Sequence, residues 1–343
     1  MKKKIAIIGA GWFGCYIGYE LIKSGYDIKI FEKEKNIFSG ASGFNQNRLH
    51  LGFHYPRSHK TISESKKGYK LFLKKFPKFS KNVKKNLYVI ARHKDNLIDF
   101  EIYKQILKSN KLKFKKEKNN LNLKNISGII SCKEKLIDMD FAKTFFYKKL
   151  KKNISFNNKV RSVKIINDKI IVDNIKFNVL INCSWQTYLP NKNLDFTYEA
   201  CLFFLYKSKI KNHPAITIMD GPFSTLYPQK KNFFSLYSVK HTRLKGFKRY
   251  KDCENFILNI RKNVNFKVVQ KKHEEQIKYF YPEFSKNFKF VKPLITYRTI
   301  INNANAERSS KIYKNGKIIN LLSGKIDHII ECSNEIKKCL KKY

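Results

Sequence analysis

The sequence predicts an α/β protein with two domains, one built around a parallel sheet and the other around a mixed or antiparallel sheet. Residues 4–32 follow the order strand, glycine-rich turn, helix, strand, which is typical of a parallel α/β unit. Short apolar or alternating runs between residues 160 and 239 are separated by turn residues, which indicates antiparallel strands. The length of 343 residues exceeds that of most single domains, so two domains are expected.

The first unit predicts a dinucleotide-binding site. An apolar strand at residues 4–8 runs into residues 9–14, GAGWFG, which fit the pattern G-x-G-x-x-G. A helix is expected to about residue 23, and a second strand at residues 28–31 leads to Glu32. The glycines permit a tight turn, the close approach of a pyrophosphate and the packing of helix on strand, while the acid can bind a ribose hydroxyl. The residues assigned to this site are Gly9, Gly11, Trp12, Phe13, Gly14 and Glu32.

The chain carries 72 lysine and arginine residues against 26 acidic ones, a formal net charge of +46. Such an excess is common in nucleic-acid-binding proteins. Here, however, lysine is spread along the whole chain beside many Asn, Ile, Phe and Tyr residues, which share A/T-rich codons. No zinc-finger, RNP-type or helix-turn-helix signature accompanies it. We therefore expect non-specific adhesion to polyanions but no specific nucleic-acid partner.

The composition also bears on the location of the protein. No apolar run approaches the roughly 18 residues of a membrane-spanning helix. The lysines at residues 2–4 and the apolar residues after them imitate a signal peptide, but glycines interrupt the apolar stretch and no small-residue cleavage site precedes residue 25. The cysteines are scattered and lack C-x-x-C spacing, which is typical of reduced thiols and gives no metal site. We expect a soluble, cytoplasmic protein.

Residues 39–57 are the most informative segment after the glycine-rich turn. They are rich in small and hydrogen-bonding side chains, show little apolar periodicity and bring Asn, Gln, His and Arg close together. A loop of this kind either connects elements in solvent or binds a ligand, and the density of polar groups favours a ligand.

The other elements follow from apolar periodicity and turn residues. Residues 95–109 predict a helix, and residues 111–125 predict a polar, exposed excursion. The apolar face of that helix would consist of Ile98, Ile102, Ile106 and Leu107. Further helices are expected at residues 63–76, 140–150, 252–265 and from about residue 325 to the C-terminus. Strands are expected at residues 86–92, 160–166, 169–172, 177–183, 199–206, 215–219, 224–227, 233–239, 297–301 and 318–322.

Five segments, in order over nearly the whole chain, resemble the D-amino-acid oxidase-like (DAO-type) FAD-dependent oxidoreductases. The first unit ends in Glu32-Lys33, where the family has an acid and then a basic residue. Residues 39–47 are similar to the segment that wraps the flavin, and residues 179–185 to the V-V-N-A-A-G-x-W strand that lines FAD. Residues 220–228 resemble part of the substrate sheet, and residues 322–328 resemble the turn and helix that close over the flavin.

The resemblance implies an FAD cofactor and enlarges the predicted cofactor site. The added residues are Lys33, Ser42, Asn45, Gln46, Asn47, Cys183, Ser184, Gly324 and Lys325. Two departures place bulkier groups or charge near the flavin: Cys183-Ser184 replaces the usual Ala-Gly, and the closing turn has one glycine where many relatives have several. We expect a discontinuous, Rossmann-like FAD-binding domain interrupted by a substrate domain. The FAD-binding domain would comprise residues 1–80, 136–196 and 305–343, and the substrate domain residues 81–135 and 197–304.

The resemblance also implies hydride transfer to flavin N5 from a carbon that bears an amine or a hydroxyl. A substrate carboxylate would need a cation, and arginine can bind it through two hydrogen bonds. Arg298 is the first candidate and Arg308 its rival, the alternative for each being a structural ion pair. His50 and His54 are candidates for proton transfer, substrate contact or covalent flavin attachment, the alternative being a hydrogen-bonded pair in a packed loop.

We therefore predict an FAD-dependent oxidoreductase that oxidises a CH–NH or CH–OH group of a small amino acid, amine or hydroxy acid. The first alternative is a flavin- or nicotinamide-nucleotide-binding enzyme that acts on a sugar or a carrier-linked intermediate. Two further alternatives are a binding or regulatory protein with a vestigial nucleotide site and a basic nucleic-acid binder.

Overall fold

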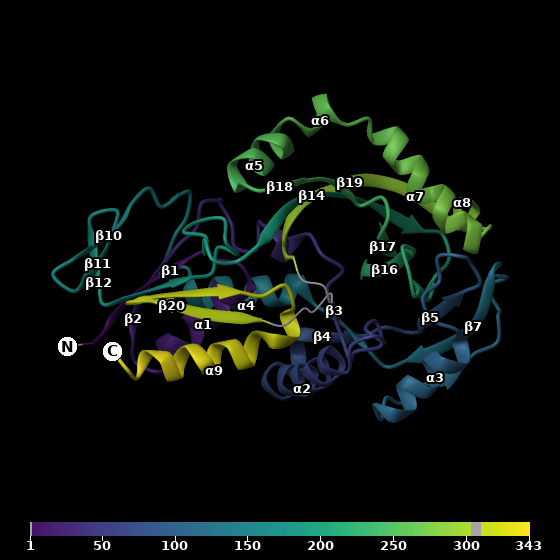
Figure 1. The fold of residues 1–343 in the computed structure, drawn as a ribbon, viewed down its shortest axis with the longest axis horizontal. Coiled ribbons are helices and arrows are strands. Elements are labelled where there is room, and N and C mark those ends of the chain that lie inside the picture. Colours follow the sequence, from purple (N-terminus) through teal and green to yellow (C-terminus); the bar gives the residue numbers. More distant parts are fainter. Residues whose placement is uncertain (1, 303–309) are drawn as a thin grey trace.

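The computed structural model describes residues 2–302 and 310–343, and two large sheets dominate it (Figure 1). The first sheet has six strands in the order β20-β21-β13-β1-β2-β9. All neighbouring strands in it are parallel except β20 and β21. Its strands are β1 (Lys4–Ile8), β2 (Asp27–Phe31), β9 (Ile154–Ser155), β13 (Val179–Asn182), β20 (Lys311–Asn315) and β21 (Ile318–Leu322). A parallel sheet with β1 between β2 and β13 is the arrangement that the glycine-rich unit predicts.

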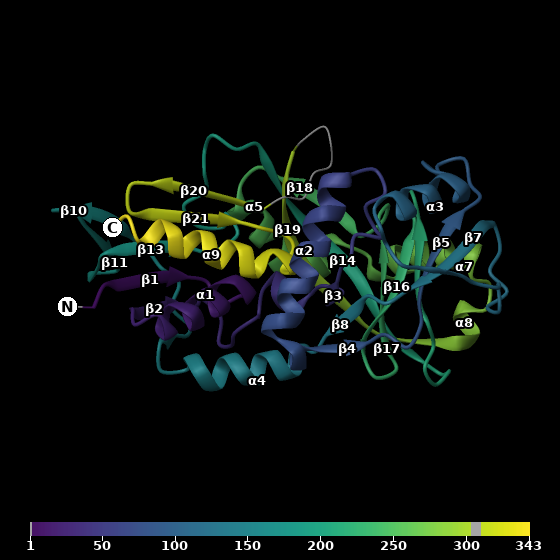
Figure 2. The same ribbon diagram turned by 90° about the horizontal axis from the view of Figure 1, so that it is seen from below.

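Helices cover one face of this sheet, and a small antiparallel sheet covers the other. Apolar side chains of four helices share a core with the first face, and Figure 2 shows these helices in front of the strands. They are α1 (Trp12–Lys23), α2 (His59–Lys75), α4 (Met139–Leu150) and α9 (Ile329–Leu340). The opposite face packs on β10 (Val163–Ile166), β11 (Lys169–Val172) and β12 (Ile175–Phe177). Because β1 is buried on both faces, it is apolar from residue 5 to residue 8 rather than alternating.

The second sheet has nine strands in the order β18-β14-β17-β16-β15-β5-β7-β6, with β19 also paired to β14. Only the pair β5 and β15 is parallel. Its strands are β5 (Asn86–Ala91), β6 (Lys115–Lys116), β7 (Ile126–Cys132), β14 (Phe196–Ser208), β15 (Ala215–Met219), β16 (Ser224–Lys230), β17 (Phe233–Ser238), β18 (Arg243–Phe247) and β19 (Phe288–Ile301). The antiparallel middle section predicted from the sequence is therefore present.

The two faces of the second sheet differ in chemistry. The outer face is apolar and packs on α7 (Phe266–Phe280) and α8 (Phe284–Asn287). Helices α5 (Tyr250–Leu258) and α6 (Ile260–Asn263) lie on the same side (Figure 1). The strand register places polar and aromatic residues on the inner face, among them Glu199, Tyr237, Tyr227, Thr217 and Tyr88. This face is directed at the segment that follows β2, because Arg48 reaches Thr217 and Tyr88 there.

A fourth sheet, of three strands, lies where the two large sheets meet. It consists of β3 (Arg48–Leu49), β8 (Lys135–Ile137) and β4 (Ser80–Asn82). Three 3-10 turns complete the fold: η1 (Ala41–Gly43), η2 (Pro77–Phe79) and η3 (Ile326–His328). Four helices have an N-cap residue whose side chain accepts a hydrogen bond from a backbone amide of the first turn, an amide that has no partner within the helix. These caps are Ser58 for α2, Asp99 for α3 (Phe100–Ser109), Asp138 for α4 and Asn265 for α7.

The predicted α/β class is confirmed, but several predicted helices were wrong in extent. The helix predicted at residues 95–109 begins only at Phe100, because Asp99 caps it. Its buried face is Phe100, Tyr103 and Leu107, whereas Ile102 is 48% exposed. The chain before residue 100 therefore does not continue the apolar stripe that Ile98 and Ile102 suggested.

The region after residue 250 differs most from the prediction. The helix predicted at residues 252–265 is two short helices, α5 and α6, that meet at Asn259. Helix α7 was missed because most of its residues are polar and its buried positions are few, namely His273, Ile277 and Phe280. Strand β19 is also far longer than the predicted strand at residues 297–301. The domain boundaries stay a prediction. Within the described residues no helix has the length and apolar character needed to cross a bilayer.

Candidate cofactor and substrate site

The glycine-rich turn contains positions at which a side chain would not fit. Gly9 has a φ of +96°, a left-handed conformation that favours glycine, and a Cβ there would lie 3.0 Å from the carbonyl oxygen of Cys183. A Cβ at Gly14 would overlap the carbonyl oxygen of Gly9. At Gly11 a Cβ would lie 2.9 Å from Ser42 Oγ, a side-chain atom. The turn therefore brings the start of α1 against the ends of β1 and β13 only because these residues are glycines.

Two hydrogen bonds connect this turn with the other predicted cofactor residues. The amide of Ala10 donates to Glu32 Oε2 at 2.7 Å, and the amide of Trp12 donates to Ser42 Oγ at 3.0 Å. Burial raises the pKa of Glu32, while the amides of Glu34 and Ala10 oppose that rise. The turn, Glu32 and Ser42 thus form one cradle at the N-terminus of α1, where helix amides attract an anion.

Trp12 and Phe13 contribute to the cradle less than their position in the motif suggests. The Trp12 indole is buried and stacks on Phe38 at a centroid distance of 4.8 Å. Phe13 is partly buried and packs against the same apolar core. The side chain of Trp12 therefore belongs to the core, and its amide is the group that lies at the cradle.

The residues predicted to wrap the flavin are held by the second sheet. Asn45 Nδ2 donates to the carbonyl of Ser42 at 2.9 Å, and Asn45 Oδ1 accepts from the amide of Asn47 at 2.6 Å. Asn47 Nδ2 donates to Gln229 Oε1 at 2.8 Å, and Gln46 Nε2 lies 3.5 Å from Ser235 Oγ. This segment therefore spans the gap between the cradle and the inner face of the second sheet.

The end of β13 and the closing turn meet at an indole ring. Gly324 faces Trp185, since a Cβ at this glycine would lie 3.6 Å from the ring. Ser184 Oγ bonds the backbone of Tyr188, so it stabilises its own loop. Burial raises the pKa of the Cys183 thiol, which keeps this sulfur protonated, while the backbone carbonyl of Cys183 lies against Gly9.

Lys325 is directed away from the cradle. It is buried, its Nζ donates to Ser65 Oγ and pairs with Asp327 Oδ2 at 3.2 Å, and it lies 4.6 Å from the centre of the Tyr55 ring. The closing turn is thereby joined to the loop that carries His50.

The two candidate histidines lie side by side in that loop. The ring of His50 is 5.9 Å from the ring of His54 and 5.6 Å from that of Tyr55, measured between centroids. His50 Nδ1 also lies 3.8 Å from Glu134 Oε1. The structure therefore brings the predicted proton-transfer candidates together with the closing turn of the predicted cofactor site.

Arg298 lies on the inner face of the second sheet. Its Nε donates to Glu199 Oε2 at 2.5 Å and its Nη1 donates to the hydroxyl of Tyr237 at 2.6 Å. Arg243 Nε approaches the other oxygen of Glu199 at 3.2 Å. Two guanidinium groups around one carboxylate leave a net positive charge at this position. Arg308 lies outside the described residues.

Buried polar atoms indicate that this region fits a polar ligand such as FAD. Within the described part of the chain, Asn47 Oδ1 and Trp185 Nε1 are buried and have no hydrogen-bond partner. Buried polar groups are nearly always paired, so an acceptor and a donor left open beside the cradle fit a ligand that carries both kinds of group. FAD has donors and acceptors along its whole length, and the residues present suit it.

The comparisons with known proteins agree with this geometry. A family model described as "FAD dependent oxidoreductase" (DAO) matches residues 4–117. The curated protein "FAD-dependent monooxygenase FPY4" of Fusarium mangiferae is 32% identical over 95% of this chain and 88% of its own length. The chain belongs to the DAO-type FAD-dependent oxidoreductase family. A second relative of this flavoenzyme, "FAD-dependent monooxygenase kojA" of Aspergillus flavus, is 22% identical over 97% of the chain and 84% of its own length.

Solved structures show that the whole flavoenzyme has the fold of this family. L-alpha-glycerophosphate oxidase from Mycoplasma pneumoniae superposes with a TM-score of 0.77 at 15% identity, covering 99% of this chain and 95% of that one. Glycine oxidase from Geobacillus kaustophilus gives a TM-score of 0.72 at 11% identity, covering 96% and 91%. The flavoenzyme is therefore an oxidoreductase that uses FAD, as the sequence predicted.

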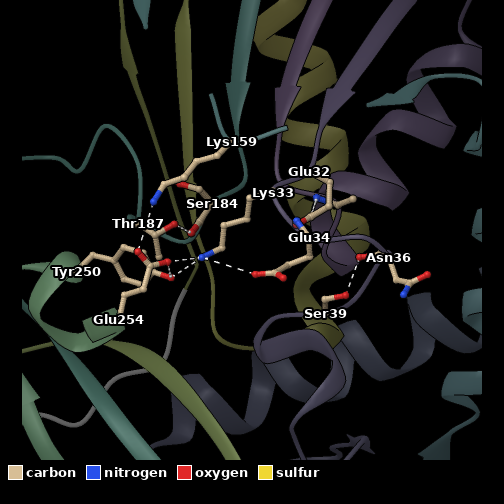
Figure 3. A network of polar contacts seen from close by, with 11 residues as sticks. Glu32, Lys33, Glu34, Asn36, Ser39, Lys159, Ser184, Thr187, Tyr250 and Glu254 are labelled. Atoms are coloured by element: carbon tan, nitrogen blue, oxygen red, sulfur yellow. Dashed lines mark hydrogen bonds and ion pairs between the residues drawn. The ribbon is translucent and has the colours of Figure 1, made fainter. Parts of the chain in front are cut away.

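Lys33 connects the cofactor cradle of the flavoenzyme with helix α5 (Figure 3). Its Nζ donates to Glu254 Oε1 at 2.6 Å and to the hydroxyl of Tyr250 at 2.8 Å. Burial alone would lower the pKa of Lys33, but the Glu254 carboxylate raises it. Since Lys33 follows Glu32 directly, these hydrogen bonds hold α5 next to the part of the cradle that contains Glu32.

We expect Glu254→Gln to release FAD more quickly than the wild-type flavoenzyme. The substitution keeps the shape of the side chain but removes the charge that holds Lys33. Because both side chains are about one-third exposed or less, the pair contributes at most about 1 kcal/mol, or roughly a fivefold change in release rate. Flavin fluorescence after dilution measures this rate. The control is Glu34→Gln, whose carboxylate lies 3.8 Å from Lys33; equal rates in all three proteins would contradict the expected role of α5.

The sequence analysis missed the partners of the predicted residues. Arg48 and Glu134 are buried charges near His50, and Glu199 and Tyr237 hold Arg298. Acidic residues are few in this chain, so a lone acid such as Glu134 shortly after the apolar residues 129–130 was the available signal.

Proposed function

We propose that the flavoenzyme oxidises a CH–NH or CH–OH group of a small amino acid, amine or hydroxy acid. The observation that carries the proposal is the net positive cluster of Arg298, Arg243 and Glu199 on the inner face of the second sheet. A cation held in a fixed orientation suits a substrate carboxylate, because a guanidinium sets both the charge and the direction of binding.

The residues of the chain divide the work in this proposal. Arg298 orients the substrate, and Tyr237 holds the guanidinium in place. His50 accepts the proton that leaves the substrate nitrogen or oxygen when the adjacent carbon is oxidised. FAD, when bound, would supply the two-electron acceptor for the hydride, with oxygen or another acceptor as the final oxidant. The seven free thiols support a reducing, cytoplasmic setting for this reaction.

An anaerobic absorption experiment tests this function. The flavin-loaded protein is mixed with amino acids of both configurations, with amines and with 2-hydroxy acids. We expect at least one carboxylate-bearing compound to bleach the visible flavin bands without any other reductant. In the His50→Gln variant the same compound should bleach them roughly 100-fold more slowly or worse.

A second candidate function is monooxygenation, which the names of the two curated relatives, both FAD-dependent monooxygenases, favour. A monooxygenase of this kind would need electrons from a separate reductant before it acts. Bleaching by a reduced nicotinamide nucleotide, with none by any member of the panel, would overturn the oxidase proposal in favour of this one.

A further inference from the structure

A buried carboxylate, that of Glu134, lies next to His50. Glu134 lies between β7 and β8 and is 1% exposed. Its Oε1 accepts from the amide of Leu51 at 2.7 Å, and its Oε2 accepts from the hydroxyl of Tyr88 at 2.8 Å and from Asn86 Nδ2 at 3.3 Å. With three donors from two separate segments, this carboxylate has one orientation.

The charges around Glu134 keep it ionised. Burial by itself would raise its pKa, but His50, Arg48 and the amide of Leu51 outweigh burial and lower the pKa to about 2. Arg48 is also buried, and it reaches Tyr88 and Thr217 at 3.1 and 2.9 Å while its guanidinium lies 3.9 Å from the centre of the Tyr227 ring. The stability that ionised Glu134 contributes is complete above its unfolded pKa near 4.5 and is lost as the pH falls toward about 2. Glu134 is therefore an anion at every pH at which the enzyme would work.

The anion faces one specific nitrogen of the imidazole. His50 Nδ1 is buried and makes no hydrogen bond, but it lies 3.8 Å from Glu134 Oε1, and this places the other ring nitrogen, Nε2, farther from the carboxylate. A carboxylate beside Nδ1 favours the tautomer with the proton on Nδ1, which leaves a lone pair on Nε2. An imidazole in this state can accept a proton at Nε2, and the nearby negative charge stabilises the imidazolium that results.

From this arrangement we infer that Glu134 is a positioning residue whose charge favours the proton on Nδ1 of His50 and so makes Nε2 the proton acceptor. The inference rests on the proposed function, in which substrate oxidation releases a proton to His50. The substrate loses a hydride to FAD from carbon and a proton to Nε2 from nitrogen or oxygen, so two electrons and two hydrogens leave together. Glu134 itself neither contacts substrate nor gives up or takes a proton.

Other charged or titratable groups lie in this region. His54 and Tyr55, in the same loop, contact the His50 ring. Arg48 on β3 lies over the ring of Tyr88 on β5, and Lys325 lies over the ring of Tyr55. Arg48 and Lys325 are cations, and Glu134 is the anion that lies beside His50. Removal of the Glu134 charge should therefore make protonation of His50 less favourable.

The test is the pH dependence of flavin reduction in Glu134→Gln, with the substrate found in the anaerobic screen. His50 must be neutral to accept a proton, so the rate falls on the acidic side. We expect that acidic limb to move to lower pH by about one unit or more, and the maximal rate to fall at least tenfold. Nitrogen NMR of the histidine side chains in the FAD-loaded protein gives a second readout without substrate: the neutral His50 ring should carry its proton on Nδ1 in the wild type and lose this preference in Glu134→Gln.

Controls separate a positioning role from a structural one. Tyr88→Phe removes a donor to Glu134 but keeps its charge, so the acidic limb should not move to lower pH. If Glu134→Gln alone does not fold with FAD, the pair Glu134→Gln and Tyr88→Phe removes the clash between the new amide and the tyrosine hydroxyl, and it is measured instead.

The outcomes also separate this inference from the proposed function. If His50→Gln loses the acidic limb but Glu134→Gln keeps it unchanged, the role of Glu134 is overturned and the function stands. If His50→Gln reduces its flavin as quickly as wild type, the role of His50 in the proposed function fails first. A limb that moves to higher pH in Glu134→Gln would contradict the sign of the electrostatic argument.

Discussion

Gly14→Ala is expected to yield a protein that does not retain FAD. A Cβ at this position would overlap the carbonyl oxygen of Gly9, and this atom is backbone held between β1 and α1. The helix would have to move away from the strand, which opens the turn at the point where α1 presents its amides. Overpacking of this kind costs about 1–3 kcal/mol or more, and here it acts on the cradle itself. The measurement is the ratio of flavin to protein after purification, together with the melting temperature.

The control for this experiment is Gly18→Ala, one turn further along the same helix. A Cβ at Gly18 would approach the terminal methyl groups of Ile30 and Ile28 at 2.8 and 3.0 Å, and these side chains can rotate. We expect a lower melting temperature for this variant but a full complement of FAD. Gly11→Ala should lie between the two, because a Cβ there displaces Ser42 Oγ from the amide of Trp12. Full flavin retention by Gly14→Ala would refute the role assigned to the turn.

Arg298→Lys is expected to reduce kcat/KM for carboxylate-bearing substrates by about 10- to 100-fold. Lysine keeps the charge but cannot donate to Glu199 and Tyr237 from one rigid plane as Arg298 does. The loss of charge-assisted hydrogen bonds in a fixed orientation corresponds to about 1.5–3 kcal/mol. Amine substrates without a carboxylate should lose much less, and steady-state kinetics with matched pairs of substrates measure the difference.

Arg243→Lys is the matched control, since Arg243 contacts the same carboxylate of Glu199. Its side chain is 52% exposed, against 30% for Arg298, so its interaction is screened by solvent. We expect a change of twofold or less. Equal losses in the two variants would mean that Glu199 and its partners act only as a structural ion pair, which was the alternative for Arg298.

The part of the fold that could be predicted is the part formed by residues close together in the sequence. The unit from β1 to Glu32 uses neighbours within about thirty residues, so strand, turn, helix and acid are visible in the sequence and in the same order in the structure. The α/β class, the family and the FAD cofactor follow from this unit and the ordered segments after it. Helix α7 escaped prediction because its stability comes from a few side chains packed on the second sheet rather than from an obvious apolar stripe.

The electrostatic partners of the site needed the tertiary structure. Leu51 and Glu134 are 83 residues apart, Arg298 and Glu199 are 99 apart, and Lys33 and Glu254 are 221 apart. No local sequence pattern identifies such pairs, because the partner of a charged residue depends on how distant segments pack together. The sequence by itself determined the nucleotide-binding unit and the oxidoreductase family. Only the tertiary structure decided which carboxylate lies beside His50. Burial lowers the local dielectric constant and so strengthens the interaction between charges, and burial depends on the whole fold.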